Sequence, residues 1–416
     1  VTLSFIVAAV GCAFAGLCYA EFAAMIPIAG SAYTYAYTTM GELVAWIIGW
    51  ALIMEYALGA ATVSIAWSEY LNNLLGGAIP YEWCHSPFEK LYKVSADVVT
   101  QLQALPGDWK GIEKGILSAA QYENLPAEMM KNVSITTGFI NAPALVILLA
   151  LTLLLIKGTK ESALVNAIIV FVKVAIVLVF IVIGWQFIKP ENHTPYLIPE
   201  GTFGHEGFFK WGWGGVLGGA GIVFFAFIGF DAVSTTAQEA KNPKRDMPIG
   251  ILGSLAVCTV LYILFAHVLT GVASVEDFRT GGKEASVAFA IQKYMIGYEW
   301  LAQFVTVAIL AGFSSVILVM LLGQSRVFYA MGKDGLLPKA FGEIHPKYNT
   351  PYKANLAILV IVGLFAAFIP GDIVGDMTSI GTLFAFILVC VSVVVLRKRE
   401  PDMKREFRAP LSDPKF

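Results

Sequence analysis

The sequence predicts an all-α integral membrane protein, and three observations support this fold class. Only 14% of the 416 residues are charged and 57% are hydrophobic, whereas soluble domains carry about 25% charged residues. Nine apolar runs approach the length of roughly 20 residues that a helix needs to cross a hydrocarbon core. Because lipid cannot hydrogen-bond an exposed backbone amide, nine such runs in one chain must fold as a bundle of helices.

Each run is expected to form one membrane helix, and together the runs make a single transmembrane domain over residues 1–416. The runs are 1–25, 43–75, 138–156, 163–188, 211–236, 249–273, 300–330, 353–370 and 379–396. Several are longer than a bilayer requires, so we expect them to tilt.

The unequal distribution of Lys and Arg between alternate connections predicts the orientation. The first set of connections holds 17 of these residues and comprises 26–42, 157–162, 237–248, 326–353 and 397–416. The second set holds 10 and comprises 76–137, 189–210 and 274–299. Basic residues favour the inner side of a membrane, so the first set is expected to face the cytoplasm.

The connection 76–137 is a 62-residue insertion that this orientation places outside the cell. Two stretches in it show apolar residues at helical spacing, separated by a break at 106–108. The residues are Leu91, Val94, Val98, Leu102 and Leu105, then Ile112, Ile116, Leu117 and Ala120. We expect two small amphipathic helices on the outer surface, which cover the bundle or meet a partner.

Lys173 is the most informative single residue because it is the only charge in the run 163–188. A charge at the centre of a bilayer costs roughly 2.5–3.5 kcal/mol on insertion scales, so Lys173 should face a cavity or a partner. Desolvation also makes a lysine easier to deprotonate, which suits proton exchange. The alternative is a structural tether between helices, with Ser314 or Ser315 as its partner.

The run 211–236 is rich in glycine and contains the sequence Ile228-Gly-Phe-Asp231 near its middle. A flexible residue beside an acid at that depth is typical of a discontinuous helix, whose exposed backbone groups bind cations, ammonium groups or carboxylates. Asp231 is therefore a candidate ligand contact. An N-cap of a second half-helix over 232–240 is an equally good interpretation.

Two glutamates also lie in apolar runs. Glu21 is near the cytoplasmic end of its helix, where a structural hydrogen-bonding role is the better interpretation. Glu55 lies deeper, so it either lines a polar path or pairs with Lys173.

Several functional classes are poorly supported. A net charge of −2 offers no basic field for nucleic acid. The five cysteines form neither a disulfide framework nor a metal-ligand pattern. The sequence has no Walker loop, no HExxH and no hydrolase triad within one polar stretch, so we expect neither an enzyme nor a bound cofactor or metal.

Five motifs resemble the amino acid–polyamine–cation transporter superfamily, most closely its cationic amino acid transporter branch and the bacterial homologues of that branch. They are CYAEF at 18–22, PIAGSAYTY at 27–35, FFAFIGFDAVS at 224–234, NPKRDMPIG at 242–250 and KDGLLP at 333–338. Together they cover nearly the whole chain apart from 76–137, and their combination is highly specific.

The resemblance implies a LeuT-like fold of two inverted five-helix repeats, with substrate between broken first and sixth helices. The run 1–25 then corresponds to the second helix of the family. We therefore expect the first helix, with half of the substrate site, and any helices after the tenth to be missing from this sequence.

The resemblance also implies roles for single residues. The backbone carbonyls of Phe225 and Ile228 are expected to receive the substrate ammonium group, with Phe225 as the aromatic gate. Lys173, approached by Ser314 and Ser315, corresponds to the lysine that couples transport to protons in sodium-independent members. Met320 is expected to limit the pocket to small neutral substrates, whereas Glu55 and Asp231 would complement a basic side chain.

The sequence thus favours a sodium-independent, proton-coupled transporter of small neutral L-amino acids in the cell membrane. A cationic amino acid or polyamine exchanger is the alternative within transport. An amino-acid-sensing receptor and a channel are the alternatives outside transport by a carrier. A channel should show polar or charged rings repeated across several helices, and these are not evident in the sequence. The lipid bilayer and the amino acid are the expected partners, and a small accessory membrane protein stays open as another.

Overall fold

The structure is a computed structural model in which helices dominate. It describes residues 1–26, 31–104, 115–117, 121–122, 125–158, 162–201, 207–234, 240–274, 277–278 and 286–410. The predicted break at 106–108 and the positions Leu105, Ile112 and Ala120 lie outside the described residues.

All nine predicted apolar runs contain helices. They are α1 (Thr2–Met25), α3 (Glu42–Leu74), α7 (Ala142–Lys157), α8 (Ser162–Gly184), α9 (Gly212–Val223), α10 (Pro243–Val272), α13 (Glu299–Lys333), α14 (Tyr352–Phe368) and α15 (Gly371–Arg399). Among the described residues, seven helical segments are long and apolar enough to cross a membrane, while α7 and α14 are shorter apolar helices. The all-α membrane bundle is therefore confirmed. The last helix begins at Gly371, eight residues before the apolar run that predicted it.

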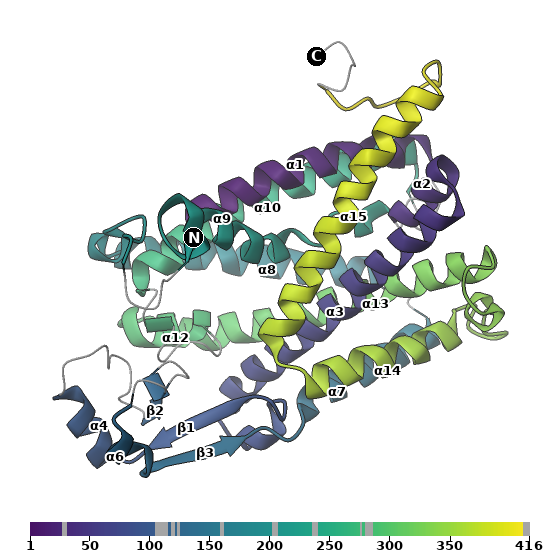
Figure 1. Cartoon of the computed structure of the whole chain (residues 1–416). Helices are drawn as coiled ribbons and strands as arrows, with labels where there is room; N and C mark the ends of the chain where they lie inside the picture. Colours follow the sequence, from purple (N-terminus) through teal and green to yellow (C-terminus); the bar gives the residue numbers. More distant parts are fainter. Residues whose placement is uncertain are drawn as a thin grey trace.

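The membrane helices pack as two groups (Figure 1). In one group, α1 lies against α9 and α10. In the other, α3 packs with α7, α13 and α14. Two helices join the groups, because α8 contacts both α10 and α13, and α15 contacts both α1 and α3.

Shorter elements lie at the ends of these helices. The helix α2 (Ser31–Met40) packs against α3 and α15, and α12 (Ser286–Tyr294) packs against α13. Short 3-10 turns complete the connections and comprise η1 (Tyr81–Trp83), η3 (Trp185–Phe187), η4 (Pro190–His193), η5 (Phe208–Lys210), η6 (Phe224–Phe227) and η8 (Lys339–Gly342). We call the end of the bundle where α1 and α15 finish and α10 begins the basic end, since Arg397, Lys398 and Arg399 lie there.

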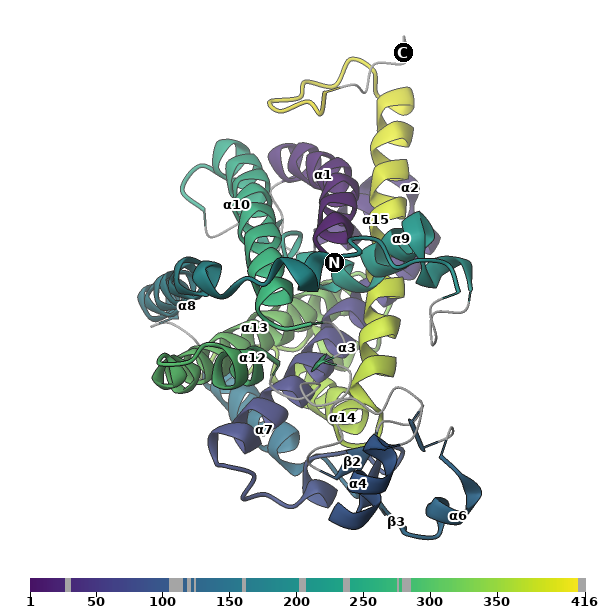
Figure 2. The ribbon, with the colours of Figure 1, turned by 90° about the vertical axis from the view of Figure 1, so that its left-hand side faces the viewer.

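The segment between α3 and α7 forms a small unit at the opposite end of the bundle (Figure 2). Its strands β1 (Lys90–Val94), β2 (Ile116–Leu117) and β3 (Val133–Thr137) make an antiparallel sheet in the order β2-β1-β3. The helices α4 (Ala96–Gln103) and α6 (Ala127–Met130) complete the unit, and Val98, Leu102 and Leu117 are buried in its core.

The helix prediction for this segment was therefore wrong in part. Val98 and Leu102 do lie on a helix, but Leu91, Val94, Ile116 and Leu117 lie on strands. The physical reason is pairing, since β1 bonds β3 along five residues and β2 on its other side. Such non-local partners cannot be recognised from apolar spacing along one segment.

Candidate functional site

A break in the membrane helix that begins with α9 creates the candidate site. The helix tightens into η6, and Ile228 then takes extended angles of φ −59° and ψ 135°. Gly229 follows with φ +109°, a conformation that side-chain-bearing L-residues rarely adopt. The discontinuous helix predicted around residues 228–231 is thus present. The interpretation of Asp231 as an N-cap concerns a half-helix whose residues 235–239 lie outside the described residues.

A cavity of about 290 Å³ lies beside this break. Four membrane helices and the broken segment supply its walls. The lining comprises Tyr56 of α3, Val170 of α8, residues 226–230, Ala232 and Val233 of the broken segment, Ser254, Leu255, Cys258 and Tyr262 of α10, and Ser315, Val316, Val319 and Met320 of α13. Most of these side chains are apolar, and none of them is ionised at neutral pH.

Ile228 and Met320, which the family resemblance assigns to the substrate site, both line this cavity. Met320 is 5% exposed, and its thioether packs on the Cα of Gly59, where a Cβ would meet Sδ at 3.0 Å. Phe225 does not line the cavity and instead packs against the core. Its carbonyl accepts a 3.2 Å hydrogen bond from the amide of Ile228. The predicted gate position of Phe225 therefore finds no support in this arrangement.

Glu55 and Asp231 come together, but behind the cavity wall rather than in it. Both side chains are fully buried. The hydroxyl of Tyr56 donates a 2.6 Å hydrogen bond to Oδ2 of Asp231, so Tyr56 stands between Asp231 and the cavity. The two carboxyl groups are near enough to interact, although neither Glu55 oxygen nor Oδ1 of Asp231 has a hydrogen bond of ordinary geometry among the described residues. Direct contact of either acid with a substrate in this cavity is not supported.

Lys173 lies between α8 and α13, one helical turn from the cavity residue Val170. Its aliphatic chain covers Gly312, where a Cβ would stand 2.8 Å from Cδ of the lysine. Cys258 of α10 lies within electrostatic range of the charged end of Lys173. Among the described residues no carboxylate forms an ion pair with Lys173, and Glu55 does not reach it.

The two serines proposed as neighbours of Lys173 make different contacts. Ser315 lines the cavity, whereas the hydroxyl of Ser314 donates to the carbonyl of Leu310 within its own helix at 2.8 Å. Such a bond inside the helix satisfies the hydroxyl without a partner on another helix. Of the two, Ser315 is the better candidate for contact with a substrate or with Lys173.

Sequence reasoning missed the part of the site that α10 supplies. Ser254, Cys258 and Tyr262 recur at a spacing of four residues, so they share one helix face. This row of polar residues on one face of an apolar run could have identified α10 as part of the site from the sequence. Across the described ranges, no group of three or more His, Cys, Asp and Glu residues could hold a metal ion.

Comparison with known proteins agrees with this architecture. A family model described as amino acid permease matches residues 1–413. The chain is 40% identical over 409 residues to the branched-chain amino acid permease BcaP of Bacillus subtilis strain 168, which covers 98% of this chain and 76% of that protein. It is 36% identical to the methylthioribose transporter of the same organism, with the same two coverages. It is also 33% identical to the vacuolar cationic amino acid transporter 4 of Arabidopsis thaliana, over 96% of this chain and 58% of that protein. The chain therefore belongs to the amino acid permease family.

Proposed function

We propose that this protein moves small and medium-sized neutral amino acids across the cell membrane by alternating access, coupled to protons and independent of sodium. The observation that carries the proposal is the cavity of about 290 Å³ beside the broken helix. Broken membrane helices place unpaired backbone groups where substrates bind in many secondary transporters. Movement of the α1 group relative to the α3 group would expose this cavity to each side in turn.

The lining of the cavity supports a neutral, apolar side chain as the preferred cargo. Val170, Val316 and Val319 offer apolar contact, and Met320 adds its thioether to the wall. A cationic side chain would lose its hydration without meeting a carboxylate, because Glu55 and Asp231 lie behind the wall, and burial of an unpaired charge is costly. The similarity to a permease named for branched-chain amino acids agrees with this preference.

An exchanger of cationic amino acids or polyamines is the second candidate. The similarity to a cationic amino acid transporter favours it, as does the hydrogen bond that joins Asp231 to the cavity-lining residue Tyr56. This candidate requires the Tyr56 side chain to move so that the acid reaches the substrate.

Proton coupling is proposed to depend on Lys173. The lysine is half-buried beside the cavity, and no carboxylate in the part of the chain that the structure describes forms an ion pair with it. A lysine in such a position can change protonation state as its surroundings open and close.

The test is uptake of labelled amino acids into proteoliposomes that contain the full-length protein. We expect an inward proton gradient without sodium to accelerate uptake of alanine, valine and leucine at least fivefold. Uptake of arginine that is independent of the gradient and driven by internal arginine would support the exchanger instead. Absence of any amino acid uptake or binding would refute both.

A further inference from the structure

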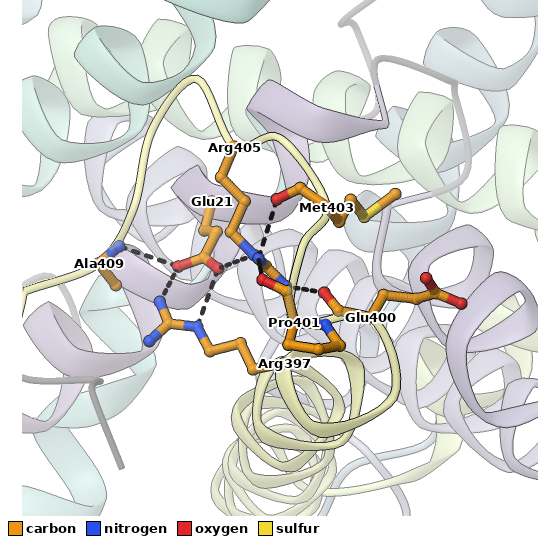
Figure 3. Close-up of polar contacts among 7 residues, drawn as sticks. All are labelled: Glu21, Arg397, Glu400, Pro401, Met403, Arg405 and Ala409. Atoms are coloured by element: carbon orange, nitrogen blue, oxygen red, sulfur yellow. Dashed lines mark hydrogen bonds and ion pairs between the residues drawn. The ribbon is translucent and has the colours of Figure 1, made fainter. Parts of the chain in front are cut away.

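Glu21 forms a buried ionic cluster at the basic end of α1 that the proposed substrate site does not use (Figure 3). Its carboxylate is fully buried. Arg397 of α15 donates to it from Nε at 3.1 Å and also from Nη2, and Nε of Arg405 forms an ion pair with it at 3.3 Å. The backbone amide of Ala409 donates to the same carboxylate at 2.9 Å. The sequence analysis favoured a hydrogen-bonding role for Glu21, and these contacts agree with it.

The residues that follow α15 are folded around this cluster. We call residues 400–410 the strap. Arg405 organises it, because its guanidinium group also donates to the carbonyls of Glu400 and Met403, each at 3.0 Å. Both arginines are almost fully covered, with side chains 9% and 7% exposed for Arg397 and Arg405. The strap therefore closes over the ends of α1 and α15 at the basic end. The distribution of Lys and Arg predicts that this end faces the cytoplasm.

The cluster strengthens the junction that α15 makes between the two groups of helices. Glu21 belongs to α1, which packs with α9 and α10, whereas Arg397 belongs to α15, which packs along α3. Arg399 extends the connection, since its Nη1 donates to the carbonyl of Thr39 in α2 at 2.8 Å. Any motion that parts α1 from α15 at this end must break the Glu21 contacts.

A closed seam runs from the cavity to this cluster. Phe230 lines the cavity and packs on Tyr19 of α1 and Phe386 of α15, with ring centroids 5.8 and 5.0 Å away. Tyr19 and Phe386 are themselves in edge contact at 5.5 Å. Beyond these rings, the thiols of Cys18 and Cys390 interact across the same helix pair. Aromatic rings, thiols and ions thus close one path between α1 and α15.

We propose that Glu21, Arg397 and the strap form a latch that holds the basic end of the transporter closed and must open once in each cycle. The inference rests on the proposed alternating access. A buried carboxylate that loses one arginine is left uncompensated, which is strongly unfavourable. The contacts should therefore break together rather than one by one, which makes the latch a two-state element.

Accessibility of Cys258 tests the latch without requiring transport. Cys258 lines the cavity and serves as the only cysteine after the other four are replaced. A membrane-impermeant thiol reagent is applied from the basic end in oriented vesicles. We expect both Arg405→Lys and Arg405→Gln to raise the labelling rate of Cys258 at least fivefold. The lysine variant keeps the positive charge but loses the planar guanidinium group. Lys404→Gln is the matched control, because the Lys404 side chain is 88% exposed and forms an ion pair only with Glu406, at 3.8 Å, within the described part of the chain.

Cross-linking gives a second test in which every latch residue is intact. In a variant that retains only Cys18 and Cys390, a short bis-methanethiosulfonate should bridge the two thiols. We expect substrate binding from the outer side to persist, uptake to fall at least tenfold, and reduction of the bridge to restore it.

Equal labelling of Cys258 in the Arg405 variants and the control would overturn the latch, as would full uptake by the bridged protein. A protein that neither binds nor transports amino acids would instead refute the proposed function. The labelling result would still decide whether Arg405 keeps this end closed.

Discussion

The hydroxyl of Tyr56 donates a 2.6 Å hydrogen bond to the carboxylate of Asp231, and both side chains are fully buried. Tyr56 belongs to α3, whereas Asp231 follows the break in the helix that packs with α1. This bond therefore connects the two helix groups directly behind the cavity wall. Because the ring of Tyr56 also lines the cavity, a substrate that displaces it would alter the contact between the groups.

Replacement of Tyr56 by phenylalanine should weaken this connection while keeping the shape of the cavity. The change leaves a buried oxygen of Asp231 without its donor, which typically costs about 1–3 kcal/mol. We expect the melting temperature of the purified protein to fall and the maximal uptake rate to change more than the substrate affinity. Tyr37→Phe is the control, because among the described residues the Tyr37 hydroxyl makes only an exposed 3.4 Å contact with Glu42. Equal melting temperatures for the two variants would contradict the prediction.

The contact between Gly59 and Met320 should set the size of the substrate. A methyl group on Gly59 would lie 3.0 Å from Sδ and 3.1 Å from Cε of Met320, so the thioether must shift. We expect Gly59→Ala to push Met320 into the cavity and to lower uptake of leucine relative to alanine at least threefold. Met320→Ser should have the opposite effect and admit longer side chains.

A panel of competing amino acids measures this change in selectivity. Gly11→Ala is the matched control on α1, because a Cβ there has no heavy atom within 4 Å. A leucine-to-alanine uptake ratio in Gly59→Ala that equals the ratio of the control would show that Met320 does not limit the pocket.

The sequence predicted the helices well but only part of the site. Apolar runs fix where helices form, since each must pair its own backbone in lipid. They do not fix which side of a helix faces a cavity. Glu55 and Tyr56 are neighbours in sequence, yet Tyr56 lines the cavity and Glu55 lies behind it, because their side chains diverge by about 100° around the helix. Only the packing of α3 against α13 decides between them.

Lys173 illustrates the same limit. Its isolation in an apolar run predicted a place beside a cavity or partner, and the chain lies one turn from the cavity wall. The sequence did not reveal that the aliphatic stem of Lys173 packs on Gly312 of α13. A glycine in the sequence does not reveal that a side chain from another helix packs on it.

Lys173→Ala should uncouple transport from protons. We expect the full-length variant to retain substrate binding and exchange but to lose the stimulation of uptake by an inward proton gradient. Gly312→Ala should have a weaker effect of the same kind, since its methyl group would displace the lysine stem. Gly253→Ala, where a Cβ meets nothing within 4 Å, serves as the control. Undiminished gradient stimulation in Lys173→Ala would remove the basis for the proposed coupling.

The loop that follows α8 should loosen at its contact with α10 as the pH falls. His193 stacks on His267 with ring centroids 4.6 Å apart, and Nε2 of His193 lies 3.3 Å from the Thr270 hydroxyl. Burial, and then the neighbouring His267, lower the pKa of His193 below its ordinary value of 6.5. The loop therefore binds fewer protons when it is packed against α10 than when it is released from α10. Its stability is complete above pH 6.5, and it declines as the pH falls through 6.5 toward the lowered value.

Hydrogen exchange measures this loosening at the Lys189 amide, which donates to the Gly271 carbonyl at 2.9 Å. After correction for the intrinsic pH dependence of exchange, protection at Lys189 should fall between pH 7.5 and pH 5.5. In His193→Gln the imidazole is absent, so protection should be nearly independent of pH over this range. An identical pH dependence in the variant would assign the effect to another group.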